Sequence, residues 1–427
     1  MSEMNLLCSC SISELSEGIS SKKISPERII RSHLDRIEAR DSEVQGWAYL
    51  DPVTSISEAS ALSVDGPQGL FHGIPFAVKD VFEVESTPRS YGSTLFASEI
   101  STRSSSVVEK LRDAGGICLG KTVTAEFALY KPGKTRNPHN IGHTPGGSSS
   151  GSAATVADYQ VPLALGTQTA GSIIRPASYC GVIGFKPSLG RYSRAGVLET
   201  SPTLDTVGFF CRTATDALLV DRVLAEREEE VSPTGAASRN FMVGVYQHQN
   251  IGEASSVVRA VMEVAQNKFT KKMFDSKTVK PNSRFFELNN IHRIVHAFEA
   301  RRCLLSLEGF RIDRVSNLTR EFLEAAQSIS ELEYDDSVGR LLEMRQRSLE
   351  LFEGCDVLVA PAAPDYAPRG LDGTGDPVFN RMWTALGVPC ATFPMIEFPG
   401  SLPLGLQLIG RPGEDQKLLE ILKLITF

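Results

Sequence analysis

The sequence predicts one large α/β domain, and three observations support this prediction. Short apolar runs, such as residues 74–78 and 356–360, have the length and composition of buried strands. Segments with a helical apolar period lie between such runs. No proline- or serine-rich linker and no internal repeat divides the 427 residues, a length that otherwise leaves room for about three ordinary domains.

The N-terminal part of the chain is predicted to be helical over residues 11–41. Ser11 and Glu14 have the spacing of a capping box. Ser25 followed by Pro26 places a capping side chain before a proline at the first helical position. We therefore expect helix starts at both places.

The following elements are shorter and carry an apolar face or an apolar run. A buried strand is expected over 74–78, a helix over 104–114 and a short strand over 117–119. Near the C-terminus, residues 356–360 read as a buried strand and 418–425 as a closing helix.

Two longer stretches differ from the rest in composition. Residues 143–196 are rich in Gly, Ser, Thr and Ala and carry few charges, yet they are too patterned to be a linker. Residues 225–353 are charged and have a helical period. The middle third of the domain is therefore expected to be mainly helical.

Composition excludes several classes of function. Apolar residues make up 41% and charged residues 22% of the chain, as in ordinary globular proteins. Lys and Arg number 44 against 51 Asp and Glu, a formal net charge of −7. The basic surface of a nucleic-acid-binding protein is not indicated. No apolar run is long enough to span a membrane, and residues 1–10 lack the pattern of a secretory leader.

The eight cysteines are scattered over the whole chain. In a large protein this scatter favours reduced, mostly buried thiols in a cytoplasmic setting. Cys8 and Cys10 have no second pair at zinc-like spacing and no nearby histidine. We therefore expect a cytoplasmic protein without a bound metal.

One pattern match suggests nucleotide binding but lacks its structural context. Residues 115–122 fit the P-loop pattern, which requires a strand before its first glycine and a helix after its lysine. Here a predicted helix precedes the match, and the residues within it are strand-like. This order argues against a phosphate site.

A second match, residues 147–151, fits the nucleophile elbow of α/β-hydrolases. That elbow follows a buried strand, whereas residues 131–146 contain three prolines and few apolar side chains. The histidines available later in the chain, His248, His292 and His296, have no distinctive surroundings. The spacing of His292 and His296 favours a partly exposed helix face.

A lysine and two serines form the more informative combination. Lys79 ends an apolar run, where desolvation would favour a neutral amine able to act as a base, or where it could pair with Asp80. Ser172 follows small residues at a predicted helix start, which suits either a helix cap or a nucleophile beside free backbone N–H groups. With the serine-rich loop around Ser148, the set is typical of Ser–Lys catalysis.

A series of spaced motifs extends this pattern over nearly the whole chain. The motifs are GIP at 73–75, VKD at 78–80, GGSSSGS at 146–152, AGS at 170–172, CGVIGFKP at 180–187, LDTVG at 204–208, DVL at 356–358 and GLQLIGRP at 405–412. On these motifs the sequence resembles the amidase signature family. NPHN at 137–140 and NRMWT at 380–384 are most similar to its malonamidase-like branch.

The resemblance implies a fold and a catalytic set. The fold is a single α/β/α domain over 1–427 with a large mixed central sheet flanked by helices, a catalytic signature region at 70–215 and a substrate-shaping helical region at 225–353. Lys79 corresponds to the base, Ser148 to the bridging serine that usually follows a cis peptide bond, and Ser172 to the nucleophile.

The backbone of Thr169, Ala170, Gly171 and Ser172 corresponds to the family's oxyanion hole. Many members have glycine at the position of Ala170, so a positive φ there would strain this chain. The implied reaction is hydrolysis of a small linear, non-peptide amide through an acyl-enzyme, without cofactor or metal. Arg175 is expected either to bind a substrate carboxylate, as in malonamate, or to hydrogen-bond loop carbonyls.

The expected partner is a small-molecule amide, with no nucleic acid and no membrane, and a homodimer is left open. Two other functions also remain open at this point. One is the glutaminase-type A subunit of a tRNA-dependent amidotransferase, which has the same catalytic set. The other is a binding protein without catalysis on the same fold.

Overall fold

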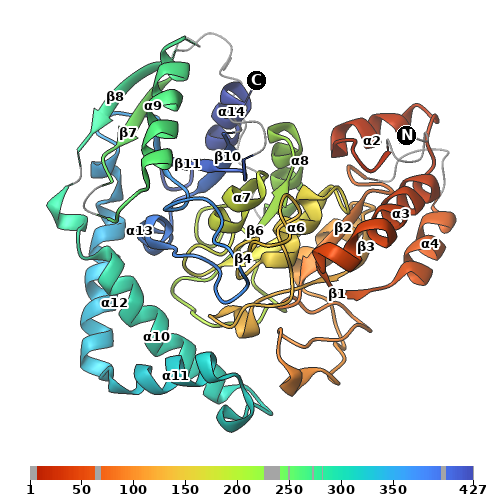
Figure 1. Cartoon of the computed structure of the whole chain (residues 1–427), viewed down its shortest axis with the longest axis horizontal. Coiled ribbons are helices and arrows are strands. Elements are labelled where there is room, and N and C mark those ends of the chain that lie inside the picture. Colours follow the sequence, from red (N-terminus) through yellow and green to blue (C-terminus); the bar gives the residue numbers. More distant parts are fainter. Residues whose placement is uncertain are drawn as a thin grey trace.

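The computed structural model describes residues 7–62, 69–225, 241–248, 251–271, 274–280, 282–395 and 401–426. Its centre is an 11-stranded sheet with the order β1-β3-β2-β4-β6-β5-β10-β11-β9-β7-β8, and helices cover both faces (Figure 1). The predicted α/β domain with a mixed central sheet is thus confirmed. The expectation that residues 1–10 form no leader falls partly outside the described residues.

The strands are short, and most are buried along their whole length. They are β1 Trp47–Leu50, β2 Pro75–Lys79, β3 Ile117–Thr122, β4 Leu163–Gln168, β5 Ile183–Lys186, β6 Thr206–Cys211, β7 Met242–Tyr246, β8 Asp275–Val279, β9 Val357–Pro361, β10 Cys390–Pro394 and β11 Gly405–Gly410.

The helices lie between the strands and over the sheet. They are α2 Ile12–Ser20, α3 Pro26–Val44, α4 Pro52–Ala61, α5 Ser106–Asp113, α6 Ser150–Ala157, α7 Ile174–Cys180, α8 Ala214–Leu224, α9 Ser256–Lys271, α10 Leu288–Ser306, α11 Asn317–Ala325, α12 Glu331–Gln346, α13 Val378–Leu386 and α14 Asp415–Ile425. Short 3₁₀ helices are η1 Thr94–Phe96, η2 Glu126–Ala128, η4 Ser283–Phe285, η5 Ile312–Arg314, η6 Ala326–Ser328 and η7 Ser348–Leu351.

The sheet mixes both strand directions. β2 runs parallel to both β3 and β4, and β7 runs parallel to both β8 and β9. The strands from β4 through β6, β5, β10 and β11 to β9 are joined antiparallel. The parallel group of β2, β3 and β4 brings the carboxyl ends of three strands to one edge of the sheet, where ligand sites commonly form.

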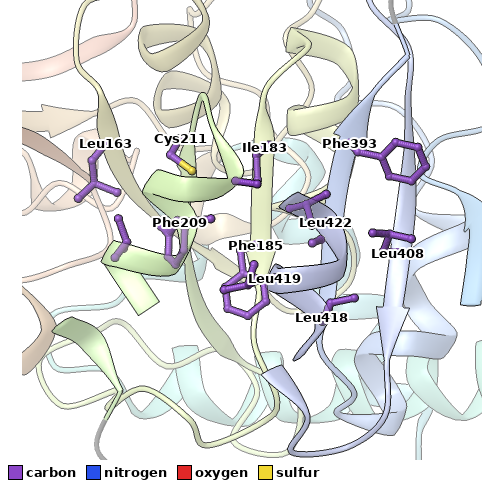
Figure 2. Packing of buried hydrophobic residues seen from close by; sticks show 14 of the residues in the cluster. Leu163, Ile183, Phe185, Phe209, Cys211, Phe393, Leu408, Leu418, Leu419 and Leu422 are labelled. Atoms are coloured by element: carbon purple, nitrogen blue, oxygen red, sulfur yellow. The ribbon is translucent and has the colours of Figure 1, made fainter. Parts of the chain in front are cut away.

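Alternating side chains fill two hydrophobic layers, one on each face of the sheet. Phe209 packs in the layer under α2, α5, α8, α9 and α14, whereas its neighbour Phe210 packs in a layer under α3, α4, α6 and α7. Figure 2 shows part of the first layer, in which Leu419 and Leu422 of α14 belong to the same buried cluster as the strand residues Phe185 and Leu408. Strands buried on both faces explain why their sequences are continuous apolar runs.

The local predictions agree with the structure apart from one interruption. The helical stretch 11–41 is two helices, α2 and α3, and each begins at the predicted cap. The Ser11–Glu14 capping box is formed. The predicted strands and the closing helix appear as β2, β3, β9 and α14 with shifted ends.

The helical region, residues 225–353, contains more than helices. Its described residues also supply β7 and β8, which extend the sheet at one edge. Helices α10, α11 and α12 lie together beside that edge (Figure 1). This arrangement places α10 against both α12 and α13.

The cysteines agree with the prediction of mostly buried thiols. All eight cysteines are free, and all except Cys10 and Cys303 are buried. Among the described residues, no helix is long and apolar enough to cross a membrane. The same residues contain no group of three or more His, Cys, Asp or Glu side chains arranged to hold a metal ion.

Candidate active site

Lys79 is the last residue of β2 and is fully buried. Its Nζ lies 2.7 Å from Ser148 Oγ and 2.8 Å from Thr167 Oγ1. Thr167 belongs to β4, which pairs in parallel with β2, so the two side chains meet at the carboxyl ends of neighbouring strands. The structure thus brings two of the three expected catalytic side chains into direct contact.

Burial lowers the pKa of Lys79 to about 7, and the nearby Asp205 carboxylate acts in the opposite direction. A lysine with this pKa is substantially neutral near neutral pH and can accept a proton. The alternative pairing of Lys79 with Asp80 is not observed. Asp80 instead pairs with Lys121 at 2.8 Å, and both side chains are buried.

The ion pair between Lys121 and Asp80 also shows how the lysine of the apparent P-loop match is used. Lys121 lies inside β3 and not at a helix start, so its ammonium is engaged within the fold. The prediction that residues 115–122 do not form a phosphate site agrees with this placement.

Ser148 lies in the loop that leads into α6, and the Gly147–Ser148 peptide bond is cis, as the resemblance implied. The neighbouring Ser149, the central residue of the apparent nucleophile elbow, is fully buried and donates to the Thr167 carbonyl. The elbow interpretation is therefore not supported, because Ser148 and not Ser149 contacts Lys79.

Ser172 lies in a tight turn between β4 and α7. Gln168 Oε1, at the end of β4, accepts the backbone N–H groups of Ile173 and Ile174 at 2.8 and 3.0 Å. Within the described part of the chain, the N–H groups of Ala170, Gly171 and Ser172 have no acceptor. These groups remain available to an oxyanion.

The turn is confined by its neighbours. A Cβ at Gly171 would collide with Asn380 Oδ1, so glycine is required there for space. Ala170 is not among the residues with positive φ, and the anticipated strain from alanine does not arise. α7 begins at Ile174, two residues after Ser172, but Arg175 N–H still donates to Gly171 O at 3.0 Å.

Arg175 is buried beside the nucleophile position and is only partly satisfied. One of its terminal nitrogens donates to Gly147 O at 2.6 Å and to Thr374 Oγ1 at 3.0 Å. Its Nε and other terminal nitrogen are buried and have no hydrogen-bond partner among the described residues. Burial lowers the pKa of Arg175 to about 10, so the guanidinium stays charged at neutral pH. Arg175 therefore holds the loop that contains Gly147, and two of its nitrogens remain available to a ligand.

A cavity of about 550 Å³ opens at Ser172. Ser172 and Arg175 form part of one wall. The helical region supplies much of the remainder, with the lining residues His292, Arg293, Ile294, His296, Ala297, Phe322, Ala325, Ala326, Ser328 and Ile329. Arg381 also lines the cavity and pairs with Asp376 at 3.3 Å.

The interpretation of His292 and His296 as a partly exposed helix face is wrong. Both rings are buried, because α10 packs its polar face against the cavity and the turn. His292 Nε2 donates to the Thr169 carbonyl at 2.8 Å. Sequence reasoning also passed over Thr167 and Gln168, whose contacts depend on strand pairing that no local pattern reveals.

Comparisons with known proteins show the family of the chain. A family model described as Amidase matches residues 28–419. The A subunit of glutamyl-tRNA(Gln) amidotransferase from Anaeromyxobacter sp. (strain K) is 30% identical, covering 96% of this chain and 94% of that protein. The subunit from Acinetobacter baumannii (strain AYE) is 31% identical with the same coverage.

Solved structures give the same result. A crystal structure of an amidase has a TM-score of 0.87 and 27% identity, covering 97% of this chain and 99% of that one. A peptide amidase in complex with chymostatin has a TM-score of 0.84 and 25% identity, covering 97% and 96%. On the match of the family model and of these relatives over almost its whole length, the chain belongs to the amidase signature family.

Proposed function

We propose that this amide hydrolase uses Ser172 as nucleophile, Ser148 as proton bridge and Lys79 as base. The observation that carries the proposal is the 2.7 Å contact between the buried Lys79 amine and Ser148 Oγ. Neutral Lys79 takes the Ser148 proton while Ser148 takes the Ser172 proton, and Ser172 Oγ adds to the amide carbonyl. The N–H groups of Ala170, Gly171 and Ser172 stabilise the resulting oxyanion.

The same groups complete the reaction in reverse. The tetrahedral intermediate collapses as the C–N bond breaks, and the proton held by Lys79 returns through Ser148 to the departing nitrogen. Water then adds to the Ser172 ester with the relay again accepting a proton. Release of the carboxylic acid restores the free Ser172 hydroxyl.

For the substrate we infer a linear, non-peptide amide that carries a carboxylate. Beside Ser172, Arg175 keeps two buried donor nitrogens that have no partner in the described part of the chain, and a guanidinium can bind a carboxylate through such donors. Arg293 and Arg381 add positive charge to the cavity, and its described lining contains no Asp or Glu. This inference corresponds to the malonamidase-like branch, with residues 70–215 supplying the chemistry and 225–353 shaping the substrate space.

The test compares malonamate with propanamide, a neutral amide of similar size. Purified protein should hydrolyse malonamate, and Ser172→Ala should abolish the reaction while the protein stays folded. Arg175→Ala should raise KM for malonamate by about 10- to 100-fold, the cost of one charge-assisted pair, and should affect propanamide much less. Equal losses on both amides would assign Arg175 to the loop alone.

The names of the relatives favour one second candidate, a glutaminase subunit of an amidotransferase. Glutamine has an α-carboxylate that Arg175 can bind, but it also carries an α-ammonium group, which prefers a carboxylate neighbour. The positive cavity lining disfavours that group. Hydrolysis of glutamine, together with copurification of a second subunit from the native host, would support this candidate over the acid-amide hydrolase.

A further inference from the structure

Two side chains from outside the nucleophile turn hold consecutive carbonyl groups within it. His292 Nε2 of α10 donates to Thr169 O at 2.8 Å. Thr384 Oγ1 of α13 donates to Ala170 O at 2.7 Å. Both donors are buried, and they come from helices distant in sequence from the turn. Neither His292 nor Thr384 has a role in the proton relay.

Each of these carbonyls shares a peptide plane with an oxyanion donor. Thr169 C=O belongs to the same rigid unit as Ala170 N–H, and Ala170 C=O to the same unit as Gly171 N–H. In a trans peptide the two groups point in opposite directions. A hydrogen bond that anchors the carbonyl therefore fixes the direction of the N–H, and it also polarises the peptide so that the N–H donates more strongly.

The two anchors are themselves fixed. Gln168 Nε2 donates to Thr384 Oγ1 at 2.9 Å, while Gln168 Oε1 holds the amides of Ile173 and Ile174. Burial lowers the pKa of His292 well below its usual range, and the ring is neutral at working pH. The Thr169 carbonyl then requires the tautomer with its proton on Nε2.

We propose that His292 and Thr384 are positioning residues that aim the Ala170 and Gly171 N–H groups at the oxyanion. The inference rests on the proposed function of Ser172, since an oxyanion forms only if Ser172 attacks. It gives α10 of the helical region a part in the chemical step, in addition to lining the cavity.

The experiment measures the rate at which a fluorophosphonate labels Ser172. In this reaction Ser172 gives its proton to the relay of Ser148 and Lys79 while its Oγ forms a bond to phosphorus and the P–F bond breaks. Fluoride leaves, and the phosphoryl oxygen occupies the oxyanion hole. Loss of an oxyanion donor itself costs about 100- to 1,000-fold in enzymes, so loss of its anchor should cost less. We expect His292→Ala and Thr384→Val each to slow labelling by about tenfold and to lower kcat on malonamate equally, with KM within about twofold.

Conservative variants and matched controls separate positioning from general destabilisation. His292→Gln and Thr384→Ser keep a donor and should recover most of the rate. His33 and Thr135 are also buried and also donate to backbone carbonyls, of Gln160 and Gln45, away from the site. His33→Ala and Thr135→Val should therefore lower the Tm without changing the labelling rate of the folded protein.

The outcomes distinguish failure of the positioning role from failure of the proposed function of Ser172. If mass spectrometry finds no label on Ser172 of the unmodified protein, the proposed function fails. If Ser172 is labelled and both His292→Ala and Thr384→Val react at the unmodified rate, the positioning role is wrong. Thr384→Val is nearly isosteric, so it decides the question alone should His292→Ala not fold. A rise in KM with unchanged kcat would also overturn the inference.

Discussion

The signature region, residues 70–215, and the helical region, residues 225–353, face the same cavity but are built differently. The signature region places reactive atoms through short turns of small residues, as in the loop that carries Ser172. The helical region reaches the cavity with large side chains from α10 and α11, such as His292 and Phe322. The signature region holds the reactive atoms in place through its backbone turns. The helical region contributes much of the volume and charge of the cavity around those atoms.

Because of this difference, we expect that substitutions can change the rate of the chemical step and the choice of substrate separately. Buried polar contacts join the two regions at a few points. Glu126 of the signature region accepts bonds from Ser316 and Thr319 at the start of α11. Glu299 of α10 accepts from Ser201 and Thr203. Substitutions of the relay residues in the signature region should therefore lower kcat. Substitutions in the helical region should change KM or stability, except at His292, which contacts the nucleophile turn.

The largest expected effect is that of Lys79→Met in the signature region. Removing the base should lower kcat by about 10⁴-fold or more, because members of one relay act as a unit. The control is Lys186→Met, since Lys186 is also fully buried but donates to the carbonyls of Pro187 and Val388. Its folded fraction should keep normal activity. Retention of most of kcat in Lys79→Met would break the assignment of the base.

Breaking the contacts that join the two regions should lower the stability of the folded protein. Glu126→Gln presents an amide to side chains that donate to the carboxylate, including Ser93 at 2.9 Å. The free energy of unfolding should fall by about 1–3 kcal/mol, measured by urea denaturation. Glu324→Gln, an exposed position on α11, is the control and should change little. Equal stability of the two variants would mean that Glu126 does not join the regions.

A smaller effect is expected from Phe322→Ala in the cavity wall. The Phe322 ring centroid lies 4.8 Å from that of Tyr130, which belongs to the signature region and lines the same cavity. Its removal should raise KM for octanamide by about tenfold, or about 1.4 kcal/mol, and leave propanamide and both kcat values nearly unchanged. A drop in kcat for propanamide would contradict the division between the regions.

The smallest expected effect is that of metal removal. The proposed relay uses only Lys79, Ser148 and Ser172. Incubation with EDTA should therefore leave kcat unchanged, in the unmodified protein and in active variants of either region. The measurement is the rate of malonamate hydrolysis before and after dialysis. A loss that added metal restores would contradict the relay.

The sequence predicted the signature region better than the helical region, and the reason is physical. Ser148 and Ser172 lie in turns of small residues whose composition is itself unusual, and Lys79 ends a recognisable apolar run. These segments carry the family resemblance. His292 contacts Thr169 across 123 positions of sequence, and an i, i+4 histidine pair on a charged helix looks the same whether its face is buried or exposed. Strand order likewise hid Thr167, because β2 and β4 are adjacent only in the sheet.

The pH dependence of kcat/KM tests the central claim most directly. Only the neutral amine of Lys79 accepts a proton, and its pKa lies at about 7 because of burial. The rate should therefore be low in acid, rise as pH increases through about 7, and reach a plateau above it. A rate that stays flat from about pH 5.5 to about pH 9, or that falls over this range, would contradict a neutral lysine as the base.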